Sequence, residues 1–220
     1  MSKITSVEPQ KKNPKRFNIF LDGEFAFGAD EDLVVNSRLV VGKVVPSEEL
    51  QKILFEVEVG KLMERMYRWF ALRQHSEKEV REYFRIKNLE LRIKEKEQMS
   101  QLVIDATVET LKRKGMVNDL GFTKAWVEAR RKTKQKGIKA IKQELFQKGI
   151  DKEIIEEVMG YGLGVISEED LAKQALEKKM KFLKHLNTLD LKKKAYEFLL
   201  RKGFEYEVVK KTIESLTKKV

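Results

Sequence analysis

The sequence predicts a mainly α-helical protein: three tandem three-helix repeats forming an elongated, curved solenoid, preceded by a small N-terminal β-hairpin module. Three observations lead to this fold class. Apolar residues alternate around an Asp-Gly pair early in the chain, but from Ser47 onward they recur with the 3.6-residue period of helices. Proline is absent after Pro46, as expected of nearly continuous helix with short turns. A characteristic helix ending recurs three times in the helical part.

Residues 1–46 are expected to form the β module. The segment 16–27 alternates around Asp22-Gly23, a pair that readily takes the positive φ angles of a two-residue hairpin turn. On the second strand the alternation places Phe25 and Phe27 on one face. The other expected elements are a strand near Ile4–Val7, a polar loop over Pro9–Pro14, a short capped helix from Asp30, a strand within residues 39–45 and a helix capped by Ser47.

The internal repeat is the most informative feature of the helical part. Residues 82–88, 143–149 and 197–203 share an apolar position followed by a basic residue and a final Gly or Asn. Helices commonly end in a left-handed residue, which Gly adopts freely and Asn tolerates, and a lysine in the last turn complements the negative helix end. A helix is therefore expected to end at each copy. The aligned pairs are Lys87-Asn88, Lys148-Gly149 and Lys202-Gly203.

The spacing of these copies leaves room for three short helices in each unit. Helix starts are expected at the capping box Ser76-x-x-Glu79, at Asn118 and at Ser167. The charged insert 89–98 is expected to lengthen the third helix of the first unit. Small helical units gain their missing core by stacking, which favours a solenoid. The expected domains are 1–46 (β-hairpin module), 47–117 (repeat 1 with a lead-in helix), 118–164 (repeat 2) and 165–220 (repeat 3).

Positive charge is concentrated in the helical part. Residues 1–57 contain 8 Lys/Arg and 9 Asp/Glu, a net charge of −1, whereas residues 58–220 contain 38 and 26, a net charge of +12, so that the positive charge of the chain, +11 in total, belongs to the helical region. A basic surface attracts polyanions such as nucleic acid or an acidic protein groove. A solvated surface that serves only solubility is the alternative.

Composition argues against several classes of protein. The chain has no cysteine, which excludes disulfides and thiolate zinc sites, and its two histidines, His75 and His185, are far apart. His75 is expected at the surface or an edge. The segment Gly160–Gly164 lacks the Lys-Ser/Thr of a phosphate loop. No apolar run is long enough for a signal peptide or a membrane span. We expect a cytoplasmic, monomeric protein with no metal, no cofactor, no membrane partner and no catalytic residues.

Candidate binding residues are therefore basic side chains. The densest stretch runs from Lys124 to Lys148, where the turn after the first helix of repeat 2 is expected to present several charges together. Phe122, Ala125, Trp126 and Ala129 form one apolar stripe at helical spacing. Trp126, Phe122, Phe146 and Tyr83 lie on apolar stripes, and we assign these four to core packing rather than to base stacking. The candidates are Arg130, Arg131, Lys132, Lys134, Lys136, Lys139 and Lys142 in repeat 2, Arg73, Arg81 and Arg85 in repeat 1, and Lys192 and Lys193 in repeat 3, within a cluster that also holds Lys178, Lys179, Lys181, Lys184 and Lys194.

The segment 115–131, GMVNDLGFTKAWVEARR, resembles the signature of the RecX family, with a glycine-terminated helix, an acidic cap, Phe, Ala, Trp and Val, and paired arginines. Residues 136–150 and the capped helix start at 76–80 resemble the same family. The resemblance covers about residues 58–220, or the whole chain with the N-terminal extension that some members carry. Asn88 departs from the pattern, because a glycine is usual there.

The resemblance implies a regulator of RecA that binds the groove of the RecA–DNA filament and limits filament growth, ATP hydrolysis and strand exchange. Single- or double-stranded DNA would then meet the basic surface. One alternative is a basic helical DNA-binding protein that acts without RecA contact. Another is a protein-interaction scaffold whose charge serves only solubility. DNA-binding proteins lose affinity steeply with salt, and the response to added RecA separates the first two classes.

Overall fold

The computed structural model describes the chain except residues 161–165, 183–186 and 218–220. It contains two compact units, which we call unit 1 (Met1–Gln74 with Val80–Val117) and unit 2 (His75–Glu79 with Asn118–Val220). Of the residues singled out above, Lys184, His185 and the segment 161–164 lie outside the described residues. Among the described residues, no helix is long and apolar enough to cross a membrane.

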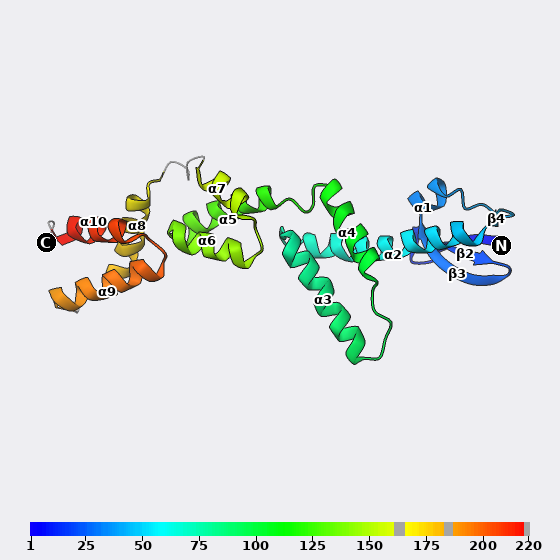
Figure 1. The fold of residues 1–220 in the computed structure, drawn as a ribbon, viewed down its shortest axis with the longest axis horizontal. Helices are drawn as coiled ribbons and strands as arrows, with labels where there is room; N and C mark the ends of the chain where they lie inside the picture. The colour runs from blue at the N-terminus through cyan, green and yellow to red at the C-terminus, as the bar shows by residue number, and fades with distance from the viewer. Residues whose placement is uncertain (161–165, 183–186, 218–220) are drawn as a thin grey trace. The chain divides into compact units, whose positions relative to one another are not determined.

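The β module is a four-stranded antiparallel sheet in the order β3-β2-β1-β4 (Figure 1). Asp22 and Gly23 have φ angles of 51° and 91°, which confirms the expected hairpin turn. The polar loop expected over Pro9–Pro14 is smaller, because the flanking strands leave only residues 11–12 between them. The strands are β1 (Ser2–Gln10), β2 (Asn13–Leu21), β3 (Glu24–Asp30) and β4 (Val44–Val45).

The prediction that Phe25 and Phe27 share a face is wrong. Ile19 pairs with Phe27, but the next residue, Phe20, pairs with Phe25, so that β3 carries a bulge that shifts its register. Phe27 is buried in the module core, whereas Phe25 is 59% exposed and meets Phe20 edge to face. A bulge reverses the side-chain alternation beyond it, and simple alternation in the sequence does not reveal it.

Helix α2 joins the β module to repeat 1, because the lead-in helix and the first helix of repeat 1 are one continuous helix. Its N-cap residue is Pro46, and Ser47 is its first helical residue rather than its cap. Ile53 packs in the core of the β module, and Met66 packs in the core of repeat 1. The helices of unit 1 are α1 (Glu31–Asn36), α2 (Ser47–Phe70), α3 (Glu77–Ile93), whose first turn belongs to unit 2, and α4 (Gln101–Arg113).

The expected helix end at Asn88 is also wrong, because α3 continues to Ile93. The Asn88 side chain donates to the carbonyl of Met99 and accepts from its N–H, both at 2.9 Å. Asn88 therefore fastens the loop that leads to α4, which Ser100 caps. The charged insert lengthens the second helix of repeat 1 and the following loop, not the third helix.

Repeats 2 and 3 are three-helix bundles, each with its own buried apolar core (Figure 1). Asn118 and Ser167 cap their first helices as predicted. Gly149 and Gly203 have φ angles of 76° and 84°, which confirms the two predicted left-handed helix ends. The helices of repeat 2 are α5 (Asp119–Lys134), α6 (Ile138–Gln147) and α7 (Lys152–Gly160), and those of repeat 3 are α8 (Glu168–Met180), α9 (Thr188–Arg201) and α10 (Tyr206–Thr217).

The end of α9 meets the start of α6, a contact that we call joint B and define by residues 134–140, 168, 178 and 202–203. The Gly137 N–H donates to the Lys202 carbonyl at 2.9 Å, and the Lys139 N–H donates to the Gly203 carbonyl at 3.1 Å. The Ile138 N–H donates to Glu168, in the first turn of α8. These bonds satisfy N–H groups that a helix start leaves without intrahelical partners.

A matching contact, joint A, lies earlier in unit 2 and is formed by residues 75–79, 119 and 147–149. The Ser76 hydroxyl donates to the Lys148 carbonyl at 2.7 Å, and the Glu77 N–H donates to Asp119, the first residue of α5, at 3.0 Å. Ser76 and Gly137 thus hold corresponding positions. The capping box of Ser76 and Glu79 is present, with both reciprocal bonds at 3.3 Å.

His75 was expected at the surface or an edge, but it is buried beside this capping box, with only 3% of its surface exposed. Its Nδ1 lies 3.5 Å from Glu79. Because joint A covers the start of α3, a position that looks peripheral in sequence becomes internal. Among the described residues, no group of three or more His, Cys, Asp or Glu is placed to hold a metal ion.

Candidate functional site

The carboxylate of Glu144 in α6 binds side chains from the end of α5 and from the turn that follows it. Arg130 donates to its carboxylate at 2.7 Å, the Trp126 indole donates at 2.8 Å, and Lys136 forms an ion pair with it. Burial alone would raise the pKa of Glu144, but the hydrogen bonds from Lys136, Arg130 and Trp126 together hold this pKa below its usual value. Two of the predicted cations are therefore largely neutralised within repeat 2.

Trp126 packs against the edge of the repeat 2 core and also contacts two cations. The Arg130 guanidinium is 3.9 Å from its ring centroid, and the Lys148 ammonium is 4.3 Å away. Trp126 is half-buried and stacks on Phe122, which is in the core. Because both cations are already placed over its ring, Trp126 offers little room for a stacked base.

The predicted apolar stripe of α5 is partly wrong. Ala125 and Ala129 are exposed, and Val127 is buried instead. Phe146, also assigned to the core, is 50% exposed. Tyr83 is partly buried against the core of repeat 1, as expected.

Arg131 has a different environment from the one that the sequence suggested. It is buried, forms an ion pair with Glu168 and donates to the carbonyl of Ile166 at 2.6 Å. The side chain thus links α5 to the start of repeat 3. A guanidinium enclosed in this way holds the fold together and is not presented to a partner.

Four predicted cations of repeat 2, Lys132, Lys134, Lys139 and Lys142, have no carboxylate partner within the described residues. Lys134 is described below with Gln135, and we call Lys132, Lys139 and Lys142 the outer lysines. Lys132 and Lys139 are exposed, and Lys142 is half-buried. Within the described residues, none of the three forms an ion pair. Their charges are therefore available to a polyanion.

A second group of cations gathers around Gln135, which ends α5 with a left-handed φ of 45°. Lys178 donates to its side-chain oxygen at 3.2 Å. The Lys202 ammonium donates to the Lys134 carbonyl and lies 3.4 Å from the Gln135 carbonyl. We call Lys134, Lys136, Lys178 and Lys202 the joint lysines.

Three of the joint lysines place their positive charges near Lys202. Burial first, and then the positive charges of Lys178, Lys136 and Lys134, lower the pKa of the Lys202 ammonium. Positive charges that lower the pKa of the Lys202 ammonium form a local positive field that an anion would relieve.

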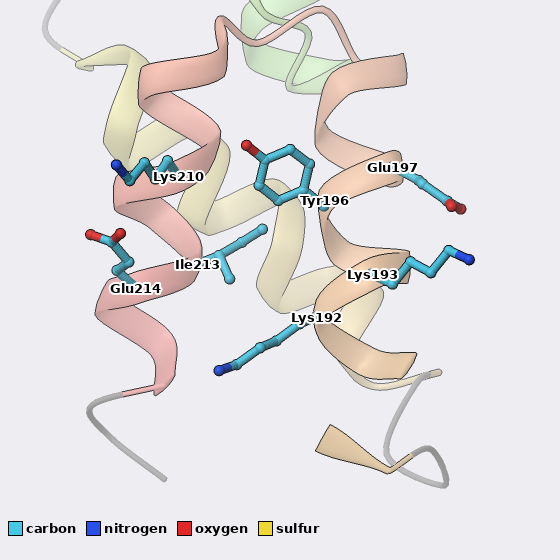
Figure 2. Close-up of a pocket in the computed structure, with 7 residues that line it drawn as sticks. All are labelled: Lys192, Lys193, Tyr196, Glu197, Lys210, Ile213 and Glu214. Atoms are coloured by element: carbon cyan, nitrogen blue, oxygen red, sulfur yellow. The ribbon is translucent and has the colours of Figure 1, made fainter. Parts of the chain in front are cut away.

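The repeat 3 candidates Lys192 and Lys193 line a groove of about 470 Å³ between α9 and α10 (Figure 2). Tyr196 and Ile213 lie between the two helices, Lys192 and Lys193 extend from α9, and Lys210 extends from α10. The hydrogen bond with Tyr206, together with burial, raises the pKa of Tyr196 to about 12. Glu197 and Glu214 also line the groove, so its charge is mixed.

The repeat 1 candidates all lie in unit 1 and have local partners. Arg81 pairs with Asp105 at 2.6 Å, Arg85 pairs with Glu82 at 2.6 Å, and Arg73 donates to the carbonyl of Gln74 at 2.8 Å. Exposed pairs of this kind contribute little to stability and exchange readily with another anion.

Sequence reasoning did not place Lys178 or Lys202 with the repeat 2 cations. Lys202 was assigned only to complement a helix end, and Lys178 was one of several lysines in a basic cluster. The aligned Lys-Gly pairs at 148–149 and 202–203 were the available signal for this placement. Each pair ends a helix, and the lysine carbonyl of each pair accepts a hydrogen bond from the preceding repeat. The sequence did not indicate that Gln135 would contact these lysines. Its left-handed conformation follows from the turn that ends α5 and not from its residue type.

Family models match three parts of the chain. Residues 2–46 match the regulatory protein RecX N-terminal domain, residues 118–159 match the second three-helix domain of RecX, and residues 167–213 match its third three-helix domain. The matched segments contain the β sheet, most of repeat 2 and most of repeat 3.

Curated relatives extend the similarity to almost the whole chain. The regulatory protein RecX of Bacillus subtilis is 34% identical over 216 residues, which cover 97% of this chain and 76% of that protein. The regulatory protein RecX of Clostridium beijerinckii is 33% identical over 218 residues, covering 98% of this chain and 96% of that protein.

Solved structures have the same fold. A crystal structure of a regulatory protein RecX superposes with a TM-score of 0.72 at 22% identity, covering 97% of this chain and 100% of that chain. The RecX of Lactobacillus salivarius superposes with a TM-score of 0.58 at 23% identity over 73% of this chain and 97% of that one. The sequence relatives and family models together show that the chain belongs to the RecX family of regulatory proteins.

Proposed function

We propose that this protein regulates the RecA recombinase by binding in the groove of the RecA–DNA filament and limiting filament growth, ATP hydrolysis and strand exchange. The observation that carries the proposal is its similarity to regulatory proteins RecX over 97–98% of its length. The protein would act without catalysis of its own, as a cytoplasmic monomer, because its role is to occupy a surface of another assembly.

The outer lysines of repeat 2 support the proposal. Lys132, Lys139 and Lys142 have no carboxylate partner in the part of the chain that the structure describes, so that binding to an anionic surface breaks no internal ion pair. Arg130 and Lys136 have smaller roles in this scheme, because Glu144 already holds them, and Arg131 is not part of the contact surface.

The test is DNA-dependent ATP hydrolysis by the cognate RecA. Substoichiometric protein is expected to suppress hydrolysis, and the variant Lys132→Glu/Lys139→Glu/Lys142→Glu is expected to require at least tenfold more protein. The matched control reverses Lys11, Lys12 and Lys15, exposed lysines on the β1–β2 hairpin, and should suppress hydrolysis like the wild type. No suppression by a stoichiometric excess of wild-type protein would remove the proposal.

A DNA-binding protein that makes no contact with RecA is the second candidate, and the net charge of +11 favours it. Binding to naked DNA and to preformed filament separates the two. A RecA regulator prefers the filament at equal DNA concentration, whereas a plain DNA binder prefers naked DNA, because RecA covers its ligand.

A further inference from the structure

The two joints of unit 2 share a backbone plan but differ in charge. Because Ser76 and Gly137 correspond, Glu79 in joint A corresponds to Ala140 in joint B. In joint A the Lys148 ammonium lies 2.6 Å from the Glu79 carboxylate. In joint B the equivalent lysine, Lys202, has backbone carbonyls as its only hydrogen-bond acceptors among the described residues. The lysine charge is thus balanced by a carboxylate in joint A and remains unbalanced in joint B.

The neighbours of joint B increase this imbalance. Lys136 occupies the position that His75 has in joint A, and Lys178 and Lys134 add two further ammonium groups. The nearby carboxylates are already engaged, because Glu144 binds Arg130 and Lys136, and Glu168 binds Arg131. Across the described ranges, Lys134, Lys178 and Lys202 form no ion pair.

Such a cluster attracts an anion. Lys202 is half-buried and fixed at the end of α5, so it cannot simply turn away from the other lysines. A compact ammonium is a point charge that suits phosphate oxygens without the fixed fork geometry of arginine. A ligand with several closely spaced negative charges would relieve the repulsion most completely.

We propose that joint B binds the phosphodiester backbone of a nucleic-acid strand through the ammonium groups of Lys134, Lys178 and Lys202. A strand carries one charge per about 3.4 Å, so neighbouring phosphates can meet neighbouring lysines, whereas one carboxylate would balance only one of them. The inference rests on the proposed function, because the RecA–DNA filament would supply the nucleic acid. It goes beyond that function by naming the chemical group that joint B contacts.

The test measures binding of a fluorescent single-stranded oligothymidylate to the full chain, without RecA, as a function of KCl concentration. The variant Lys134→Gln/Lys178→Gln leaves Lys202 in its structural contacts with α5. The logarithm of the affinity falls linearly with the logarithm of the salt concentration, and each lost phosphate contact makes this dependence shallower by about 0.7 for a single strand. The variant, which loses two contacts, should therefore have a slope that is smaller in magnitude by about 1.4. Lys11→Gln/Lys12→Gln makes the same change in net charge on the β1–β2 hairpin and should keep the wild-type slope. Circular dichroism confirms that each variant is folded.

Three results would overturn the inference: no binding by the wild type, an unchanged slope in the joint variant, or an equal loss in the hairpin control. A variant that binds the oligonucleotide normally but no longer suppresses RecA would identify joint B as a protein-binding site instead. Because no RecA is present, the expected slope loss would stand even if suppression of RecA failed, so that the two proposals fail separately.

Discussion

At the scale of single residues, Glu144 organises the cationic turn of repeat 2. One carboxylate accepts from an indole, a guanidinium and an ammonium, all from residues that sequence reasoning grouped as core or binding residues. Its interactions favour the charged form over the neutral form. The structural role of Arg130 and Lys136 therefore depends on the charge of one acid.

Substitution Glu144→Gln should lower the free energy of unfolding at neutral pH. It should also weaken the dependence of that free energy on pH in the acid range. Because the folded-state pKa is lowered, the charge contributes stability above the unfolded value of about 4.3, and that contribution is lost as pH falls through the folded pKa. Urea unfolding at pH 7, 5, 4 and 3 measures the free energies of the wild type and the variant. The gap between them should narrow below pH 4.5. A gap that stays constant with pH would contradict the role of the charge.

Arg131 is the second residue whose role the structure decides. Substitution Arg131→Met should destabilise the protein by about 3–5 kcal/mol, because it leaves the half-buried Glu168 carboxylate without its cation. The exposed neighbour Lys132→Met is the control and should change stability by less than about 0.5 kcal/mol. Adding Glu168→Met to Arg131→Met should recover part of the loss in urea unfolding. Equal effects of the two single substitutions would refute a structural role for Arg131.

At the scale of elements, joint B depends on close backbone contact. A Cβ at Gly203 would overlap with the backbone and Cβ of Ala140, and one at Gly137 would overlap with the backbone of Gly203. Joint A has the corresponding restriction, since a Cβ at Gly149 would come within 2.6 Å of the Lys78 Cβ. Glycine is thus required at Gly149 and Gly203 for two reasons, the left-handed φ and the approach of the next helix, and at Gly137 for the close approach alone.

Gly203→Ala should destabilise the protein more than Gly115→Ala. Both residues have positive φ, 84° and 69°, so both substitutions incur the backbone cost of about 1–2 kcal/mol. Only the first adds a clash, because nothing lies within 4 Å of a Cβ at Gly115. Thermal and urea unfolding of the two variants give the comparison. If Gly115→Ala proves as damaging as Gly203→Ala, close packing at joint B is not a determinant of stability.

Local signals predicted many elements correctly. The Asp22-Gly23 turn and the caps at Asn118 and Ser167 follow from chemistry within a few residues, and the structure contains all of them. The wrong predictions concern residues whose conformation depends on a contact with another segment of the chain. Asn88 continues a helix because its amide fastens the loop at Met99, a partner eleven residues away.

At the scale of the whole molecule, the protein has four separate apolar cores rather than one among its described residues. One core belongs to the β module and the start of α2, and the other three belong to the three repeats. In unit 2, hydrogen bonds and one buried ion pair join neighbouring repeats at polar contacts. Polar joints of this kind let cationic side chains gather where two repeats meet.

The sequence by itself determined the fold class, the repeat pattern, the concentration of positive charge in the helical part and the resemblance to the RecX family. Each depends on periodicity, on local capping or on composition, which are properties of neighbouring residues. Only the tertiary structure decided which cations are available to a partner. Arg131 and Lys132 are adjacent in sequence, yet one is buried against Glu168 and the other is exposed. Lys178 and Lys202 approach Gln135 because the folding of α8 and α9 brings distant charges together.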